Sequence, residues 1–270
     1  MYEILRKLRS DSLVLDVGSD EGSFPRRATS ATIVRVDRDV PLHREEGVHF
    51  VQCDAASLPF ASGIFAAVVS NHSLEHIANF AAALHEIGRV VRPDGSLFVA
   101  VPDAATFTDK LYRWLARGGG HINAFTAPDA LAKEIERATG LPHRGTRVLC
   151  SSLSFLNRRH NPGRRPRRLL LLGAGSEWSL FLYAWLSRRL DRFFKTRTSV
   201  YGWAFYFGKI AGTIDTKTWV NVCMRCGSGF SSSFLTEKAL VRRARFGVRV
   251  YRCPECGVTN SFSPEARSVD

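Results

Sequence analysis

The chain has 270 residues, a length that fits one full α/β core and a small appended module. Its formal net charge of +13 is distributed unevenly along the chain. Residues 1–150 carry 17 Lys+Arg and 18 Asp+Glu, whereas residues 151–270 carry 21 Lys+Arg and 7 Asp+Glu. The first residues, Met1–Ser12, are charged and contain no apolar run of signal length. This argues against a secreted, disulfide-stapled protein and predicts a cytoplasmic chain with reduced cysteines.

The first predicted element is a buried strand that ends in a glycine-containing turn. A largely apolar run, Ser12–Leu15, leads into Asp16, which is followed by Gly18 and Gly22. This pattern predicts a parallel strand that turns tightly into a helix, with the glycines letting the backbone approach a ligand. A dinucleotide turn has three glycines as G-x-G-x-x-G, and the acidic residues of this turn disfavour a pyrophosphate. The turn therefore predicts a site for a neutral or cationic nucleoside.

Strands and helices alternate over the next residues. Thr32–Asp37 is an apolar strand that ends in an acid about twenty residues after the first turn, where a carboxylate can accept both ribose hydroxyls. The other predicted elements are strands at Val48–Cys53, Ala66–Ser70 and Ser96–Val101 and a helix at Ile77–Val91 that stops at the turn Arg92–Gly95. The alternation predicts an α/β fold with a Rossmann-like, doubly wound, mostly parallel sheet.

Five stretches follow one another in the order of a known family. They are LDVGSDEG (15–22), VDRD (36–39), CDAASLPFASGIF (53–65), SNHSLEHI (70–77) and LHEIGRVVRPDGSLFVAVPD (84–103). Together they resemble the class I S-adenosylmethionine-dependent methyltransferases, in particular the type 11 branch, over residues 10–105. The resemblance implies S-adenosylmethionine as cofactor and methyl transfer as the activity.

The resemblance also implies which residues bind the cofactor. These are Asp16, Gly18, Ser19, Asp20, Gly22, Asp37, Arg38, Asp54, Ala55 and Asn71. In the family pattern the glycine turn faces the methionine part, Asp37 binds the ribose, and Asp54 with Ala55 contacts the adenine.

Three positions depart from the family pattern. Asp20 replaces the usual middle glycine, Ala66 replaces the acid that commonly opens the fourth strand, and Asp94 stands in a Pro-Asp-Gly where the family has Pro-Gly-Gly. The added carboxylate of Asp20 would face the sulfonium or the amino group. The helix that precedes the first strand in the family is here at most Tyr2–Arg9.

Two histidines are candidate general bases for a hydroxyl acceptor. Methyl transfer is an in-line displacement that mainly requires alignment, and the pKa of imidazole suits proton removal near neutrality. His72 follows the carboxyl end of the fourth predicted strand, the edge where ligands bind in such sheets. His121 follows a glycine run in a stretch that resembles a family loop, and a loop-fixing hydrogen bond is its alternative role. Glu75 and His76 are explained by capping or packing as readily as by chemistry.

Four of the six cysteines form two matched C-x₂-C pairs, each followed by glycine. They are Cys223, Cys226, Cys253 and Cys256. Four thiolates with this spacing predict a structural, tetrahedral Zn²⁺ without an open position, and an iron–sulfur centre or redox dithiols are the alternatives. The β-rich segments Thr218–Val222 and Val248–Arg252 make the module resemble a zinc ribbon. The remaining Cys53 and Cys150 are predicted core residues.

A basic, aromatic segment lies between the two modules. Arginine pairs occur in residues 158–168, and Glu177–Lys195 has apolar residues at helical spacing, with Trp178, Phe181 and Trp185 among them. This pattern is typical of a helix at a membrane surface. A helix packed on the domain with a solvated arginine face explains it equally well, and nucleic-acid binding is the third alternative.

The predicted organisation is a methyltransferase domain at 1–212 with a basic amphipathic insertion at 158–197, followed by a zinc-ribbon-like module at 216–264. Residues 147–150 and 201–208 resemble the last two strands of the family's sheet, which pair as a hairpin in family members, so the insertion would stand between them. The favoured function is methyl transfer to an oxygen or nitrogen of an acceptor, for which a lipid-linked or glycan intermediate at the cytoplasmic membrane face is one fitting class. The alternatives are an RNA methyltransferase and a non-catalytic membrane or nucleic-acid adaptor on the same scaffold.

Overall fold

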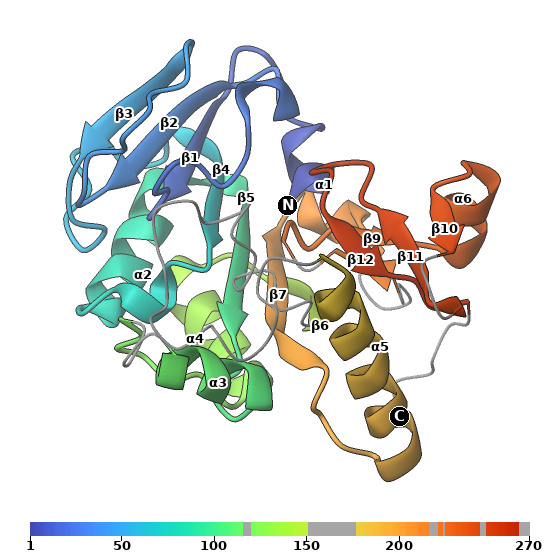
Figure 1. Ribbon diagram of the computed structural model, residues 1–270. Coiled ribbons are helices and arrows are strands. Elements are labelled where there is room, and N and C mark those ends of the chain that lie inside the picture. Colours follow the sequence, from blue (N-terminus) through green and yellow to red (C-terminus); the bar gives the residue numbers. More distant parts are fainter. Residues whose placement is uncertain (116–119, 151–176, 216–220, 224, 244–246, 265–270) are drawn as a thin grey trace. The chain divides into compact units, whose positions relative to one another are not determined.

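The computed structural model describes residues 1–115, 120–150, 177–215, 221–223, 225–243 and 247–264 (Figure 1). The chain forms two compact units, each made of separated stretches of sequence. The first comprises Met1–Pro102, Ile122–Arg147 and Trp203–Lys217, and the second comprises Asp103–His121, Val148–Gly202 and Thr218–Asp270. The domain limits 1–212 and 216–264 and the insertion limits 158–197 stay predictions.

The main sheet has seven strands in the order β3-β2-β1-β4-β5-β7-β6 (Figure 1). They are β1 (Leu13–Val17), β2 (Thr32–Asp37), β3 (Val48–Gln52), β4 (Phe65–Asn71), β5 (Val91–Pro102), β6 (His143–Cys150) and β7 (Val200–Gly208). The pairs β1–β2, β1–β4, β2–β3 and β4–β5 are parallel, which confirms the predicted Rossmann-like sheet. Strand addition reverses direction between β1 and β4, and open α/β sheets bind ligands at the carboxyl ends of the strands beside such a point.

Two helices of the first unit pack closely against each other. The helices preceding β6 in the chain are α1 (Tyr2–Leu5), α2 (Phe80–Val90), α3 (Phe107–Leu115) and α4 (Pro128–Thr139). The Asn79 side chain caps α2 by accepting a hydrogen bond from the Ala82 N–H at 3.3 Å, so this helix begins later than predicted. A Cβ at Gly88 of α2 would lie 2.7 Å from the Thr139 Cα, which shows how near α4 passes. Helix α4 ends at Gly140, whose φ is +70°.

The segment between Gly22 and Thr32, all of it described, forms one 3₁₀ turn at Arg26–Ala28 instead of the predicted helix. The prediction was wrong because the connection is short and contains Pro25, which lacks an N–H and holds an extended conformation before the turn. The glycine turn therefore is not followed by a long helix with unpaired N–H groups.

The predicted turn Arg92–Gly95 lies inside β5 rather than before it. Phe65 of β4 pairs with Val91 and Ala67 pairs with Ser96, so the two strands shift register at this segment. The Pro-Asp-Gly sequence does interrupt the regular ladder, but pairing on both sides keeps the segment in the strand.

A buried arginine ties α1 to the far edge of the sheet. The guanidinium of Arg147 on β6 donates to the Glu3 carboxylate at 2.8 and 3.0 Å, to the Tyr206 hydroxyl at 2.9 Å and to the Asp215 carbonyl at 2.6 Å. These contacts outweigh the effect of burial and raise the pKa of Arg147 above its usual value. The short α1 is thus held by a buried cation.

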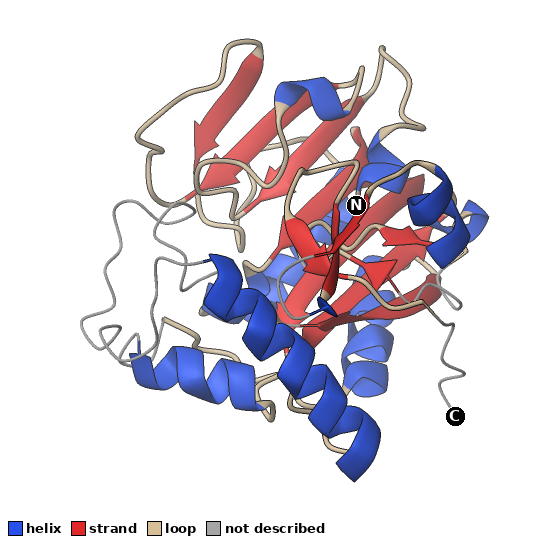
Figure 2. Cartoon of the chain, turned by 45° about the vertical axis from the view of Figure 1, so that its right-hand side comes forward, coloured by secondary structure: helices blue, strands red, loops and turns tan. Residues whose placement is uncertain are grey.

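Figure 2 shows the helices in blue and the strands in red from a second direction. The second unit contains α3, α5 and the short strands that flank the cysteine pairs. Its later elements are α5 (Glu177–Phe194), β8 (Asn221–Val222), β9 (Gly229–Phe230), α6 (Ser232–Glu237), β10 (Val241–Arg243), β11 (Arg249–Arg252) and β12 (Thr259–Ser261). The two small sheets are β8–β9 and β10–β11–β12, and all their pairs are antiparallel. The predicted pairing of the last two strands of the main sheet is confirmed, since β7 lies beside β6. Of the helices described, none has the length and apolarity to cross a bilayer.

Candidate functional site

The predicted cofactor residues gather at the carboxyl ends of β1 to β4. Asp16 of β1 lies opposite Arg35 of β2 and Val69 of β4 in the sheet register. The backbone N–H groups of Gly18 and Ser19 donate to the Val36 carbonyl of β2 at 2.9 and 3.1 Å. The turn after β1 is therefore fixed by its neighbouring strand, and the structure brings the predicted set to one edge of the sheet.

Asp16 is a buried carboxylate with spare hydrogen-bonding capacity. Its Oδ2 accepts the Ser23 N–H at 2.9 Å, and its side chain has no exposed surface. Its Oδ1 is buried and has no hydrogen-bond partner among the described residues. Burial raises the pKa of Asp16 to about 6, although the hydrogen bonds from Ser23 and the charge of Arg35 oppose this shift. Such a group is ready to accept a hydrogen bond from a cationic ligand.

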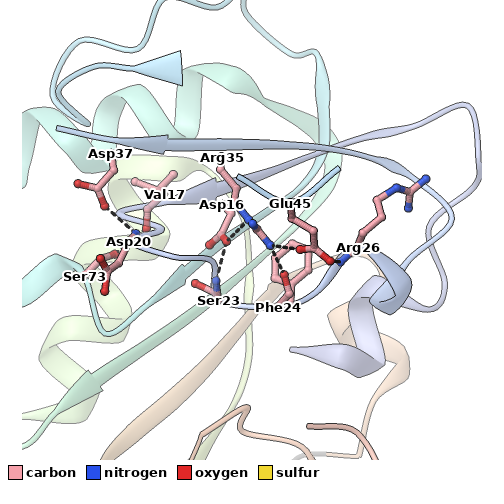
Figure 3. Close-up of polar contacts among 10 residues, drawn as sticks. All are labelled: Asp16, Val17, Asp20, Ser23, Phe24, Arg26, Arg35, Asp37, Glu45 and Ser73. Carbon is pink, nitrogen blue, oxygen red and sulfur yellow. Dashed lines mark hydrogen bonds and ion pairs between the residues drawn. The ribbon is translucent and has the colours of Figure 1, made fainter. Parts of the chain in front are cut away.

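A second buried charge, Arg35, lies beneath the glycine turn (Figure 3). Its guanidinium donates to the Phe24 carbonyl at 2.6 Å and to Glu45 Oε2 at 2.9 Å, while its Nε lies 3.8 Å from Asp16 Oδ2. A Cβ on Gly22, whose φ is +114°, would lie 2.3 Å from the Arg35 Cζ. Position 22 therefore requires glycine, because the Arg35 side chain occupies the place that a Cβ would take. We missed Arg35 from the sequence, although a charge inside the apolar run of β2 was the available signal.

Position 18 also requires glycine, because Ser73 approaches its backbone closely. Its φ is +64°, and a Cβ there would lie 2.3 Å from the Ser73 Cβ. Ser73 donates to the Val17 carbonyl at 2.8 Å, and its hydroxyl lies 2.6 Å from that of Ser70 at the end of β4. No sequence pattern pointed to Ser73, which joins the first turn to the end of β4 (Figure 3).

Asp37 lies at the end of β2 with both carboxylate oxygens engaged by backbone. Oδ2 accepts the Asp20 N–H at 2.8 Å and Oδ1 accepts the Asp39 N–H at 3.1 Å. Asp20 adopts a left-handed φ of +46° in the place where the family pattern has glycine. Its backbone, rather than its carboxylate, is what contacts Asp37 (Figure 3). The Gln52 side chain donates to the Arg38 carbonyl at 2.7 Å and so holds the backbone of Arg38 in place.

Asp54 and Ala55 follow β3 at the same edge of the sheet. The Cys53 N–H donates to the Asp37 carbonyl at 3.0 Å, so the ends of β2 and β3 stay together. Asp54 Oδ1 accepts the Ala56 N–H at 2.8 Å and forms a tight turn, while Ala55 is buried. This geometry holds the exposed Asp54 carboxylate at the strand end.

Two more buried polar atoms and a strained histidine lie at this edge. Ser19 Oγ and Asn71 Oδ1 are buried without a hydrogen-bond partner in the part of the chain that the structure describes. His72 follows Asn71 directly, has a φ of +58°, and donates its N–H to the Ala100 carbonyl at 2.9 Å. Its Nδ1 lies 3.8 Å from the carboxylate of Glu75, which is 1 % exposed. The buried Glu75 carboxylate therefore lies near the His72 ring.

His121 belongs to the second unit, where it is paired with a buried carboxylate. Its Nδ1 lies 3.0 Å from Asp109 Oδ1, and its side chain is 4 % exposed. Arg113 donates to the same carboxylate at 2.5 Å and to the His121 carbonyl at 3.1 Å. Burial opposes ionisation of Asp109, but the hydrogen bonds from His121 and Arg113 outweigh it and lower its pKa. These contacts accord with the loop-fixing alternative, and a catalytic role for His121 stays a prediction.

The four paired cysteines converge into one cluster in the second unit. All four sulfurs of Cys223, Cys226, Cys253 and Cys256 lie within 4.8 Å of one another. The two knuckles have the same backbone pattern, in which the glycine N–H donates to the first cysteine's carbonyl, at 2.8 Å from Gly227 and 3.0 Å from Gly257. Hydrogen bonds with the neighbouring cysteine sulfurs, together with burial, raise the pKa of the Cys253 thiol. Four sulfurs without an open position fit a structural Zn²⁺.

The two other cysteines lie outside this cluster. Cys53 and Cys150 are half-buried, and Cys53 packs against the hydrophobic core of the first unit, in keeping with the predicted core role for that residue.

A separate pocket of about 380 Å³ lies at the opposite end of the main sheet. It is lined at the beginnings of β1, β4 and β5 by Ser12, Ala66 and Arg92, among others. None of the predicted cofactor residues lines it. This pocket is therefore not the site to which the sequence motifs point.

Comparison with known proteins is consistent with this geometry. A family model described as "Methyltransferase domain" matches residues 2–140. A malonyl-[acyl-carrier protein] O-methyltransferase of Pseudescherichia vulneris is 29% identical over 147 residues, which are 51% of this chain and 59% of that protein. A demethylmenaquinone methyltransferase of Mycobacterium marinum is 40% identical over 76 residues, which are 27% of this chain and 33% of that protein. The chain thus matches about three fifths or less of the length of these curated relatives.

Two solved structures align with parts of this chain. A complex between the Haloferax volcanii Trm112 methyltransferase activator and a methyltransferase aligns with a TM-score of 0.49 and 13% identity, over 77% of this chain and 87% of that one. A Haemonchus contortus phosphoethanolamine N-methyltransferase 2 in complex with S-adenosyl-L-methionine aligns with a TM-score of 0.48 and 16% identity, over 76% and 50%.

Proposed function

We propose, because the chain belongs to the class I S-adenosylmethionine-dependent methyltransferase family, that it transfers a methyl group from S-adenosylmethionine to an oxygen or nitrogen of an acceptor. The observation that carries the proposal is the set of buried polar atoms without partners at the ends of β1 and β4, namely Asp16 Oδ1, Ser19 Oγ and Asn71 Oδ1. Buried polar atoms are rarely left without hydrogen bonds, so these atoms indicate a polar ligand at this edge.

The residues present fit the parts of this cofactor. Asp16 would accept from the ammonium group, with Ser19 and Asn71 completing the polar surface around the amino-acid end. Asp37 would accept from the ribose hydroxyls, since each carboxylate oxygen can accept a further hydrogen bond beside its backbone N–H. Asp54 and Ala55 would contact the adenine. When bound, S-adenosylmethionine supplies an electrophilic methyl group on a sulfonium.

His72 is our candidate for the group that removes a proton from a hydroxyl acceptor. It lies at the end of β4, and the nearly buried Glu75 carboxylate faces its Nδ1 at 3.8 Å. A carboxylate beside imidazole orients the ring and increases its basicity. The left-handed backbone of His72 costs free energy, and such strain is often found at functional sites. An amine acceptor that arrives deprotonated would not need this base.

The cofactor proposal is tested by calorimetry on Asp37→Ala. Affinity for S-adenosylmethionine should fall at least about tenfold, because two hydroxyls lose a charged acceptor. Asp39→Ala removes the same charge two residues away, from an exposed side chain, and should bind like the unmodified chain. Equal affinities for the two variants would remove the ribose assignment. A melting curve of each variant shows whether the loss of the Asp20 contact has unfolded the site.

Catalysis is tested with methyl-labelled S-adenosylmethionine and cell extract. Label should enter a small-molecule, lipid or glycan fraction, and should fall strongly in His72→Ala while cofactor binding stays intact. Label confined to RNA would overturn this acceptor class, and tight cofactor binding without any transfer would favour the scaffold alternative.

The raised pKa of Asp16 predicts that cofactor affinity depends on pH. In the free folded chain this pKa is about 6 against an ordinary value of 3.8, so folding favours the protonated form and the free protein loses stability as pH rises across that interval. Only the ionised form attracts an ammonium group. Affinity should therefore fall as pH drops through about 6, by roughly tenfold at one unit below the pKa.

Calorimetry between pH 5 and pH 7.5, roughly one unit or more on either side of this pKa, checks this expectation. Asp16→Asn should bind weakly with little pH dependence. Methylthioadenosine, which lacks the ammonium group, is the control ligand, and its affinity should change little over the same range. A flat profile for S-adenosylmethionine itself would show that Asp16 does not bind the ammonium.

A further inference from the structure

One face of the C-terminal half of α5 is apolar and exposed. Leu186 is 48% exposed, Leu190 37%, and Phe193 and Phe194 71% each. Their positions follow the spacing i, i+4, i+7, i+8, so they share one side of the helix. We call these four residues the α5 tip. The phenyl rings of the adjacent Phe193 and Phe194 leave a contiguous apolar surface in contact with water, which is unfavourable.

The end of α5 is locked, so the phenyl rings do not sit on a fraying terminus. The Asp191 carboxylate accepts from the Thr196 hydroxyl and the Thr198 N–H at 2.6 Å each, and from the Ser199 N–H at 2.8 Å and hydroxyl at 2.5 Å. Lys195 ends the helix in a left-handed conformation with φ +52°. These contacts fold the following residues back beneath the helix end and hold the tip in place.

Another side of α5 is already occupied within the second unit. Arg188 donates to the Ser261 carbonyl of β12 at 3.0 Å, and Ser187 is buried. Trp185 is half-buried, with the Arg189 guanidinium 4.7 Å from its ring centre. The helix is therefore anchored on the cysteine-bearing module through one side, which leaves the tip residues on an exposed side.

The tip differs from the face that the sequence predicts. The side chains of Trp178 and Phe181, and the arginine pairs of residues 158–168, lie outside the described residues. Trp185, the third predicted aromatic, is half-buried beside Arg189. The exposed apolar residues that the structure describes on α5 follow Trp185 and extend to the end of the helix.

The charge around the tip is strongly positive. Residues 185–197 carry five basic side chains and one acid, and that acid is Asp191, whose carboxylate is occupied by its own loop. Residues 151–270 as a whole carry 21 Lys+Arg against 7 Asp+Glu. Apolar rings bordered by cations match the interface of an anionic bilayer, where each nearby basic residue adds attraction and the rings enter the acyl boundary.

We propose that the α5 tip inserts into the interfacial layer of an anionic lipid bilayer, with the helix on the surface rather than across it. Nucleic acid fits this surface less well, because phosphate contacts need cations and base stacking needs aromatic rings on a platform, whereas the phenyl rings here share a helix face with leucines. The proposal concerns where the protein binds and is independent of methyl transfer.

The test is co-sedimentation of the full chain with phosphatidylcholine vesicles that contain roughly a third phosphatidylglycerol. Phe193→Ser/Phe194→Ser should reduce the vesicle partition coefficient at least about tenfold, since apolar burial supplies part of the affinity. Phe234→Ser, at a 39% exposed phenylalanine on α6 of the same unit, is the matched control and should bind like the unmodified chain. Raising the salt concentration should weaken binding of every variant.

Zinc content and melting temperature of the double variant show whether it is folded. Absence of vesicle binding at low salt, or binding of the folded double variant equal to that of the control, would overturn the proposal. If the double variant loses RNA binding but keeps its vesicle binding, the proposal is also overturned and the surface is assigned to RNA.

Discussion

Purified chain is expected to contain one Zn²⁺, and Cys253→Ser is expected to lose both the metal and the folded cysteine module. The four sulfurs lie within 4.8 Å of one another, and the two knuckles that carry them have matching hydrogen bonds. Removing one thiolate leaves three ligands, and apparent zinc-binding free energies in small modules of this kind are about 10–16 kcal/mol. Since the two small sheets have few strands, the metal should supply most of their folding free energy.

Elemental analysis and hydrogen exchange measure this effect. Cys53→Ser is the matched control, because this cysteine lies outside the cluster, and it should retain the full zinc content. Fast exchange in Cys253→Ser should be confined to the second unit, with S-adenosylmethionine binding retained. Iron in place of zinc, or full zinc content in Cys253→Ser, would contradict the assignment.

Gly18→Ala is expected to destabilise the first unit far more than Gly63→Ala. Both glycines have nearly the same left-handed φ, +64° and +66°, so the backbone cost of an added Cβ is about 1–2 kcal/mol at each. Only at Gly18 would that Cβ lie 2.3 Å from another atom, the Ser73 Cβ, whereas nothing lies within 4 Å at Gly63. Overpacking of this kind adds about 1–3 kcal/mol, so the total at Gly18 should be roughly 2–5 kcal/mol.

Urea denaturation followed at the first unit gives the two free energies of unfolding. Ser73→Gly in the Gly18→Ala background removes the clashing Cβ and should recover part of the loss. Equal destabilisation at the two glycines would mean that the close approach to Ser73 does not limit the turn. The comparison separates strain of the backbone from a steric conflict between two specific residues.

The sequence was sufficient to predict those features that depend on neighbouring residues. Apolar runs that end in Asp16 and Asp37 located two adjacent strands and their acidic ends, and the spacing of the cysteine pairs located the cluster. Each of these features is determined by a few neighbouring residues, so periodicity and turn chemistry reveal it.

Features that depend on distant partners were not predicted. The glycine pattern predicted a helix after Gly22, but the connection is too short. The guanidinium of Arg35, which donates to Glu45, fills the space beneath the turn. Ser73 is important only because β4 lies beside β1. Likewise α3, with the Asp109 that pairs with His121, was missed, since its role follows from tertiary contacts.

The contact between Gly22 and Arg35 makes these two positions change together in any variant of the chain. A side chain at position 22 needs the space that the guanidinium fills, so it becomes acceptable only when position 35 carries a shorter residue. A shorter residue at position 35, in turn, removes the cation beside Glu45, whose partly exposed carboxylate keeps the hydrogen bond from the Arg26 N–H. A redesign of this turn must therefore change positions 22 and 35 together.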